Sequence, residues 1–177
     1  MNFLSDFKYL TDENNVYKEI SYDEFKELLD GFHSALIIVG GSWSEEFQAV
    51  AGEVNKIAKE EKLSEIYVYD PRFINVFKEE EDLRDCLTLE NKLKYYYIVE
   101  HTGFKAPELV RDTLIAKMEV PTFFAIKNGT CVDYFTSKYI KDPFIREKDN
   151  LEDKTLEFIT RFKQLISKMN EEKTMFD

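Results

Sequence analysis

The sequence predicts a single α/β domain over residues 1–177, with a central mixed β-sheet flanked by helices. Residues Ala35–Val39 form a continuous apolar run, which is typical of a strand buried on both faces. Gly40 and Gly41 end this run, and an amphipathic helix follows. Further on, Asn128-Gly129 separates two short apolar stretches and is a strong hairpin signal. Together these features favour strands and helices that alternate around one sheet.

The first half of the chain supplies a βαβαβ pattern. Residues 1–15 are aromatic and acidic without a clear period, and we expect a short packed N-terminal arm or a helix. Val16–Ile20 alternates apolar and polar side chains and predicts an edge strand. Ser21 and Glu24 form a capping box for a helix that ends near Gly31.

The helix after the central strand needs a capping residue. Ser42 or Ser44 can fill that position, and Glu45 and Glu46 place negative charge in the first turn, which the helix dipole favours. A third strand, Ile66–Tyr69, follows this helix.

Residues 71–110 are predicted to form a helical insertion. Most of the expected apolar positions recur at helical spacing, namely Leu83, Leu87, Leu89, Leu93, Tyr97 and Ile98. Pro107 is expected to begin a further helix. Three consecutive helical positions cannot share one face, so at least one ring of Tyr95-Tyr96-Tyr97 should face the core and the others can form a contact patch.

The end of the chain predicts a hairpin and one more helix. Thr122–Ile126 and Cys131–Phe135 are the strands of the hairpin. Residues 136–150 read as a polar connection, and residues 170–177 as a frayed tail. The last amphipathic helix is predicted from Leu156, Ile159, Phe162, Lys163, Ile166 and Met169.

Charge and composition limit the classes of function. The formal net charge of −11 argues against binding to nucleic acid or to an anionic membrane. No stretch is long and apolar enough to span a membrane, and the N-terminus lacks the features of a signal peptide. Cys86 and Cys131 lie outside any paired motif, which fits a reducing compartment, and we expect a cytoplasmic protein. The histidines and cysteines have no metal spacing, so no metal or other cofactor is expected.

Two segments resemble thioredoxin. A buried strand, Trp43, four residues and a helix match its active-site half, and Val120-Pro121-Thr122-Phe123-Phe124 with Asn128-Gly129 match its Pro-containing hairpin. These segments span roughly half of the chain. The Cys-x-x-Cys of thioredoxins is replaced here by Ser44-Glu45-Glu46-Phe47.

The resemblance implies a role for each position. The attacking thiol corresponds to Ser44, the resolving thiol to Phe47, and the buried Asp that assists proton transfer to Ile38. Pro121 would follow a cis peptide bond and expose the backbone of Val120 to an extended peptide. The insertion and the Asp-Pro-Arg after the third strand are similar to small bacterial thioredoxin-like proteins of the bacteriocin transport accessory type.

The residues themselves argue against thiol chemistry at this site. A hydroxyl does not ionise at a helix N-terminus, whereas a thiol with a pKa of about 8.5 can. Ser44 is either a helix cap or a nucleophile, and neither histidine, His33 or His101, has a motif that places it beside Ser44 as a base. Trp43 either contacts a partner or covers the helix N-terminus.

Three functions therefore compete. The first is a non-redox module that binds a peptide or protein in a groove formed by Trp43, Ser44, Glu45, Glu46, Phe47, Val120 and Pro121. The second is an enzyme, including one that uses the thiol of Cys86 or Cys131. The third is a structural protein that forms a homo-oligomer, and the sequence leaves the oligomeric state open.

Overall fold

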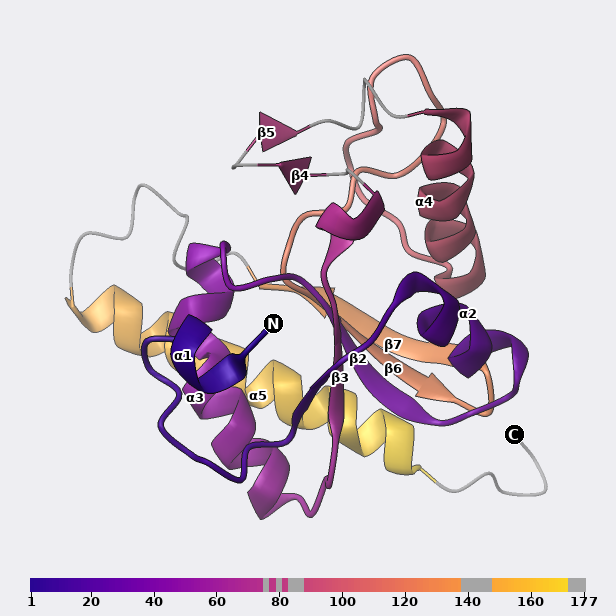
Figure 1. Ribbon diagram of the computed structural model, residues 1–177. Helices are drawn as coiled ribbons and strands as arrows, with labels where there is room; N and C mark the ends of the chain where they lie inside the picture. The colour runs from indigo at the N-terminus through magenta and orange to yellow at the C-terminus, as the bar shows by residue number, and fades with distance from the viewer. Residues whose placement is uncertain (75–76, 79–80, 83–87, 138–147, 172–177) are drawn as a thin grey trace.

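The computed structural model describes residues 1–74, 77–78, 81–82, 88–137 and 148–171 (Figure 1). A five-stranded sheet has the order β1-β3-β2-β6-β7. Its strands are β1 (Tyr17–Glu19), β2 (Ala35–Val39), β3 (Ile66–Tyr69), β6 (Thr122–Lys127) and β7 (Thr130–Thr136). The strands β1, β3 and β2 are parallel, and β6 and β7 run antiparallel to their neighbours. The predicted central mixed sheet is confirmed, with β2 in its middle.

The predicted helices before and after β2 are present. The α2 helix (Tyr22–Asp30) begins at Ser21, whose side chain forms the predicted capping box with Glu24. Of the two serines considered, Ser42 and Ser44, it is Ser44 that caps the α3 helix (Glu45–Glu60). The other helices are α1 (Phe3–Asp6), α4 (Leu89–Thr102) and α5 (Lys148–Asn170).

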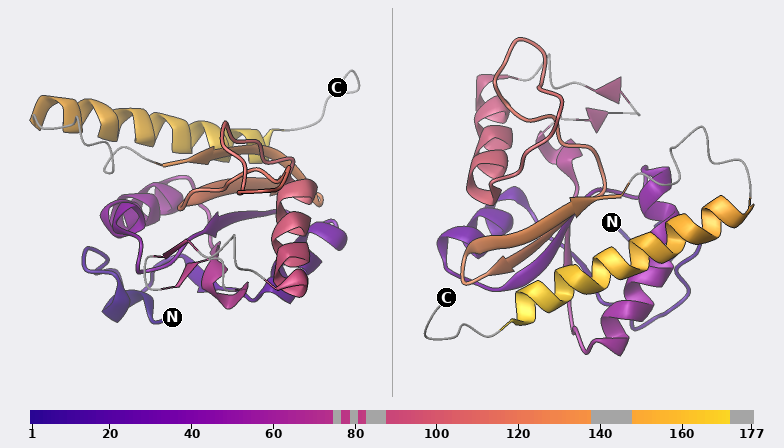
Figure 2. Two further views of the ribbon diagram at one scale, coloured as in Figure 1. Left: turned by 90° about the horizontal axis from the view of Figure 1, so that it is seen from above. Right: turned by 180° about the vertical axis from the view of Figure 1, so that it is seen from behind.

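Alternate side chains of β2 enter two separate cores. Ile37 and Val39 belong to the core that α2 and α4 cover, whereas Leu36 and Ile38 belong to the core beneath α3 and α5. Figure 2 shows α5 crossing the sheet on the same side as α3. The apolar run therefore reflects burial on both faces, because every residue of β2 is buried.

The hairpin lies at one edge of the sheet. Asn128 and Gly129 have φ angles of 50° and 78°, as a type I′ turn requires. The Gly129 N–H donates to the His33 carbonyl at 2.8 Å, so the turn packs on the loop after α2. The predicted hairpin is thus confirmed.

The predicted helical insertion over 71–110 is wrong in part. It contains a single-turn 3-10 helix, η1 (Pro71–Ile74), a two-stranded sheet of β4 (Phe77–Lys78) and β5 (Glu81–Asp82), and α4. The buried residues of α4 are Tyr95, Ile98, Val99 and Thr102, whereas Leu89 and Leu93 are 73% and 59% exposed. The assignment of Leu83 and Leu87 lies outside the described residues.

The expected helix after Pro107 is not formed. Instead, the segment bends back on itself, with Val110 N–H donating to the Ile115 carbonyl at 2.8 Å and a bridge between Leu109 and Ala116. Asp112 in this bend has a φ of 59°, which a right-handed helix does not accommodate.

The last helix begins earlier than predicted. The α5 helix starts at Lys148 and takes in the end of the expected polar connection. Its buried residues in the described part are Phe158, Phe162, Leu165 and Ile166, and Leu156 is 63% exposed. The tail after Glu171 lies outside the described residues.

Candidate functional site

The N-terminus of α3 lies directly beyond the central strand. The pairing of Val39 with Thr122 places Gly40 beside Pro121. A Cβ added at Gly40 would lie 3.0 Å from Phe47 Cδ2 and 3.4 Å from Pro121 Cβ, so these two side chains flank the Gly40 backbone. The Val120–Pro121 peptide bond is cis. The sequence-predicted residues Phe47 and Pro121 are thus close together.

The Ser44 side chain is hydrogen-bonded to the local backbone. Its Oγ accepts a hydrogen bond from the Phe47 N–H at 3.3 Å, and the residue is only 3% exposed. This bond satisfies one of the unpaired N–H groups at the start of α3. The geometry is that of a helix cap.

Phe47 fills the interior. It is completely buried, and its ring centroid lies 4.8 Å from that of Phe7 and 6.0 Å from that of Tyr17. The N-terminal arm and the first strand therefore pack on Phe47. Ile38 is also fully buried in this core.

Glu45 and Glu46 differ sharply in their surroundings. Glu45 is exposed in the first turn of α3. Glu46 is fully buried, and its Oε2 accepts a hydrogen bond from Ser137 Oγ at 3.2 Å. The Ser137 N–H in turn donates to the Pro121 carbonyl at 3.1 Å. A buried carboxylate thus connects the start of α3 to the end of β7.

Trp43 is held in place by Asp70 and Arg72. Its Nε1 donates to Asp70 Oδ1 at 3.2 Å, and Asp70 is 2% exposed. The Arg72 guanidinium donates to Asp70 Oδ2 at 2.9 Å and 2.6 Å and lies 5.5 Å from the Trp43 ring centroid. A Cβ at Gly41 would collide with Trp43 Nε1, so the indole lies directly on this backbone. We call Trp43, Asp70 and Arg72 the indole clamp.

Most of the predicted groove is closed in this conformation. Val120 is 3% exposed, and Pro121 is buried. The surface that is accessible here comes from Trp43, which is half-buried, from Glu45 and from the Arg72 side chain, which is 41% exposed. The contribution of Asp70 and Arg72 was missed at the sequence level, although both directly follow the third strand.

The described thiol lies far from this surface. Cys131 pairs across the hairpin with Ile126, which pairs with Ala35 at the opposite end of β2 from Val39. The length of β2 is about 13 Å, from four steps of about 3.3 Å. Burial raises the pKa of the Cys131 thiol to about 12. Cys86 lies outside the described residues.

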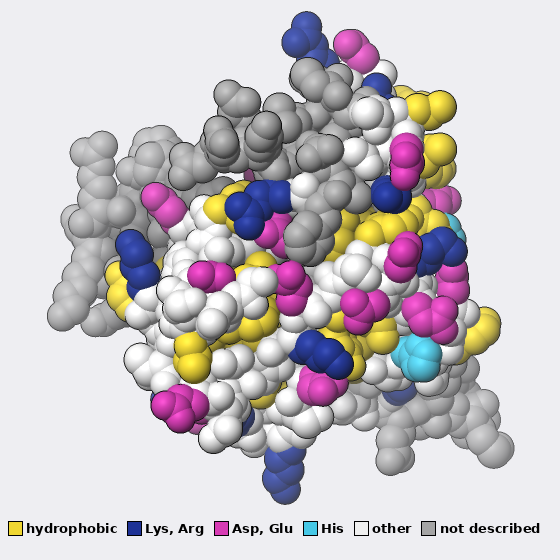
Figure 3. All heavy atoms as spheres, in the orientation of Figure 1, with side chains coloured by type: hydrophobic (Ala, Val, Ile, Leu, Met, Phe, Trp, Pro, Cys, Tyr) yellow, Lys and Arg dark blue, Asp and Glu magenta, His cyan; other side chains and the backbone are white. Residues whose placement is uncertain are grey.

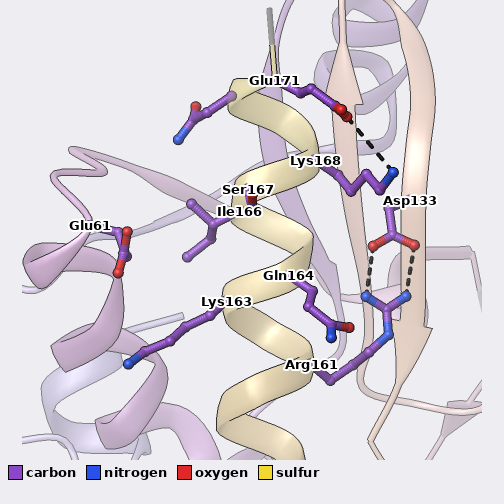
Figure 4. A pocket seen from close by; sticks show the side chains of 10 residues that line it. Glu61, Asp133, Arg161, Lys163, Gln164, Ile166, Ser167, Lys168 and Glu171 are labelled. Atoms are coloured by element: carbon purple, nitrogen blue, oxygen red, sulfur yellow. Dashed lines mark hydrogen bonds and ion pairs between the residues drawn. The ribbon is translucent and has the colours of Figure 1, made fainter.

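A cavity of about 710 Å³ lies beside α5, away from the indole clamp (Figure 4). Its charged residues include Arg161, which forms a two-pronged ion pair with Asp133 at 2.7 Å, and Lys168, which lies 3.8 Å from Glu171. Lys163 and Glu61 add one charge of each sign. The cations and carboxylates of this lining balance, so the cavity does not attract ions of one sign.

Neither a metal centre nor a membrane-crossing element is seen in the described part of the chain. No group of three or more His, Cys, Asp or Glu side chains in these residues could hold a metal ion. None of the helices in the same residues is long and apolar enough to cross a bilayer.

The strand arrangement decides the fold class. The central strand β2 has parallel strands on one side and an antiparallel hairpin on the other, and α3 follows it. This is the topology of thioredoxin. The fold is thioredoxin-like. Helices on both faces of the sheet complete this thioredoxin-like arrangement.

The comparisons with known proteins find similarity among solved structures. No family model matches the chain, and no curated protein matches it. Among solved structures, it is similar to the long form of thioredoxin f from spinach chloroplast, with 19% identity over 83% of this chain and 86% of that chain and a TM-score of 0.39. The short form has 18% identity over 86% and 99% of the two chains and the same TM-score.

Proposed function

We propose that this thioredoxin-like chain is a non-redox module that binds an extended peptide or a protein segment at the surface of the indole clamp. The observation that carries this proposal is the structural role of Ser44 and Phe47, the two positions that the resemblance to thioredoxin matches to thiols. Ser44 caps α3, and Phe47 is fully buried against Phe7 and Tyr17. The Ser44 side chain is hydrogen-bonded to the backbone and the Phe47 side chain is packed in the core, so neither of these two positions supplies a thiol.

The surroundings of Trp43 support a binding role. Tryptophan and arginine are common in the energetically dominant parts of protein interfaces. Here the indole is fixed by a hydrogen bond to Asp70 and by the Arg72 guanidinium over its ring. A side chain that is already ordered loses less conformational entropy when a partner binds. The indole clamp is therefore suited to contact a partner.

The properties of Cys131 argue against the alternative of an enzyme that uses this thiol. Thiolate is the reactive form, and a pKa of about 12 leaves almost none at neutral pH. The thiol also donates a hydrogen bond to the Asp133 carbonyl at 3.4 Å.

The likeness to bacterial proteins of the bacteriocin transport accessory type and the cytoplasmic location stay proposals that rest on the sequence.

Peptide selection tests the binding role. A random 12-residue peptide library displayed on phage would be panned on the immobilised full chain. Enriched peptides carrying a fluorescent label would then be titrated by fluorescence anisotropy, and the emission of Trp43, the sole tryptophan, would also be followed in the proteins that retain it. We expect micromolar binding that shifts this emission and weakens at least about tenfold in Trp43→Ala and Arg72→Ala. Leu156→Ala, at an exposed position of α5, should bind normally. Peptides that bind all four proteins equally would refute the proposal.

A further inference from the structure

The outer face of α4 carries apolar side chains. Leu89, Leu93 and Tyr96 follow the spacing i, i+4, i+7, and their exposed fractions are 73%, 59% and 45%. They lie opposite the buried face of the helix, which contains Tyr95 and Ile98. We call Leu89, Leu93 and Tyr96 the outer stripe. An apolar stripe on the outer face of a helix is typical of a surface that contacts another protein element.

The position of α4 leaves this stripe accessible. The helix stands at one margin of the molecule, beyond the central sheet (Figure 1). Figure 3 shows hydrophobic side chains projecting at the same margin. The neighbouring α2 packs on a different side of α4, where Tyr97 donates to Asp30 and Tyr22 lies 6.2 Å from the Tyr97 ring. A second helix can thus approach the outer stripe without displacing α2.

The charged side chains near the outer stripe indicate which helix packs on it. Glu90 pairs with Lys94 on the same helix at 3.4 Å. Lys92 and Glu100 have no charged partner among the described residues. They are eight residues apart, and Tyr96 lies midway between them. This arrangement is self-complementary, because two antiparallel copies of α4 related by a two-fold axis at Tyr96 would place each Lys92 opposite the other Glu100.

We propose that the chain forms a symmetric homodimer through antiparallel packing of the outer stripe of α4. Tyr96 meets its counterpart at the axis, and Leu93 of each copy lies beside Tyr96 of the other. Leu89 reaches the end of the second helix at Gly103, where an added Cβ would meet nothing within 4 Å. Antiparallel helix dipoles also oppose each other favourably.

The small stripe predicts a reversible dimer. Stable interfaces bury about 800 Å² on each partner, more than three side chains and their flanks provide. We therefore expect a Kd of the order of 10–100 µM. This interface is separate from the indole clamp and does not depend on the binding function proposed above.

Sedimentation equilibrium of the full chain tests the dimer. The protein concentration would run from about 5 µM to about 1 mM, a range that brackets the expected Kd. Circular dichroism would verify the folding of each variant. We expect a monomer–dimer equilibrium that Leu93→Asp abolishes over this range. Leu156→Asp, which places the same charge at an exposed leucine of α5, should leave it unchanged. A monomer at all concentrations, or a dimer that persists in Leu93→Asp, would overturn the proposal. A dimer dispersed by Trp43→Asp would also overturn it, because the contact would then involve the indole clamp.

Charge exchange tests the arrangement itself. Lys92→Glu and Glu100→Lys should each weaken self-association at least about tenfold, since each puts like charges opposite one another. A mixture of the two variants should form a heterodimer, because one variant then carries a carboxylate at both positions and the other carries an ammonium group at both. The double variant Lys92→Glu/Glu100→Lys should regain the wild-type equilibrium. Failure of both the mixture and the double variant to associate would rule out the proposed pairing.

Discussion

Trp43 and Asp70 are joined by a hydrogen bond of 3.2 Å from the indole Nε1 to the buried carboxylate Oδ1. The two residues come from different elements, since Trp43 precedes α3 and Asp70 follows β3. Arg72 shares the same carboxylate, through its backbone N–H at 3.0 Å and its guanidinium. One carboxylate thus fixes the geometry of the whole indole clamp.

Removal of that carboxylate should loosen Trp43. We expect Asp70→Ala to lower the free energy of unfolding by about 2–4 kcal/mol, because a buried group that serves several donors is lost. Trp43 emission should move to longer wavelength, with stronger quenching by acrylamide. Urea unfolding and fluorescence measure the two effects. Lys168→Ala serves as a control and should change stability by less than about 0.5 kcal/mol, since Lys168 and Glu171 are exposed.

Phe47 should be essential for the core. Phe47→Ala removes a fully buried ring that packs on Phe7 and Tyr17, so we expect a loss of about 3–5 kcal/mol in the free energy of unfolding. Urea unfolding measures the loss. The control, Tyr9→Ala, changes a 69% exposed ring of the N-terminal arm. Equal stability of the two variants would contradict the assignment of Phe47 to the interior.

Cys131 should resist alkylation in the folded protein. In a Cys86→Ser background, we expect iodoacetamide at about pH 8 to label native Cys131 at least about 100-fold more slowly than the urea-unfolded chain, whose thiol has a pKa of about 8.5. The physical reason is burial, which raises the native pKa to about 12. Mass spectrometry of quenched samples gives both rates. Comparable rates in the folded and unfolded chain would restore Cys131 as a candidate nucleophile.

Attachment of the N-terminal arm should depend on pH. The ion pair with Lys59, and hydrogen bonds from Asn55 and Asn14, lower the pKa of Asp12 to about 2. A depressed folded-state pKa contributes stability that is present above the unfolded value of about 3.9 and is lost as the pH falls through the folded value. The stability difference between wild type and Asp12→Asn should therefore be constant above about pH 5 and decrease between about pH 4 and 2. A difference that persists undiminished at the acid end of this range would contradict the assignment.

The elements with strong local signals could be predicted from the sequence. The capping box at Ser21, the buried run of β2 and the Asn128-Gly129 turn each depend on short-range chemistry that leaves one favourable structure. The cap at Ser44 was one of two choices, and only the observed bond to the Phe47 N–H distinguishes it from Ser42.

The segment between β3 and β6 could not be predicted to the same extent. Its apolar residues fit helical spacing, but Leu89 and Leu93 face outward while Tyr95 takes the core position, because its hydroxyl reaches the Ala116 carbonyl at 2.7 Å. Met118 N–H donates to the same hydroxyl at 2.7 Å. Such contacts join positions more than twenty residues apart, and periodicity within one helix carries no information about them.

The role of Asp70 was hidden for the same reason. A carboxylate that follows a strand and precedes a proline reads as a turn residue. Its contact with Trp43 becomes visible only when β2 and β3 are aligned side by side. The sequence predicts a site at the end of β2, but the residues that hold the indole, Asp70 and Arg72, follow the neighbouring strand β3.

The function proposed here requires that no thiol chemistry takes place at the N-terminus of α3. It is tested most directly by the reduction of insulin disulfides by dithiothreitol, followed by turbidity, with and without the full chain. We expect the rate of dithiothreitol alone at every protein concentration, for wild type and Ser44→Ala alike. Turnover that rises with wild-type concentration would contradict this expectation, and its loss in Ser44→Ala would place the activity at the start of α3.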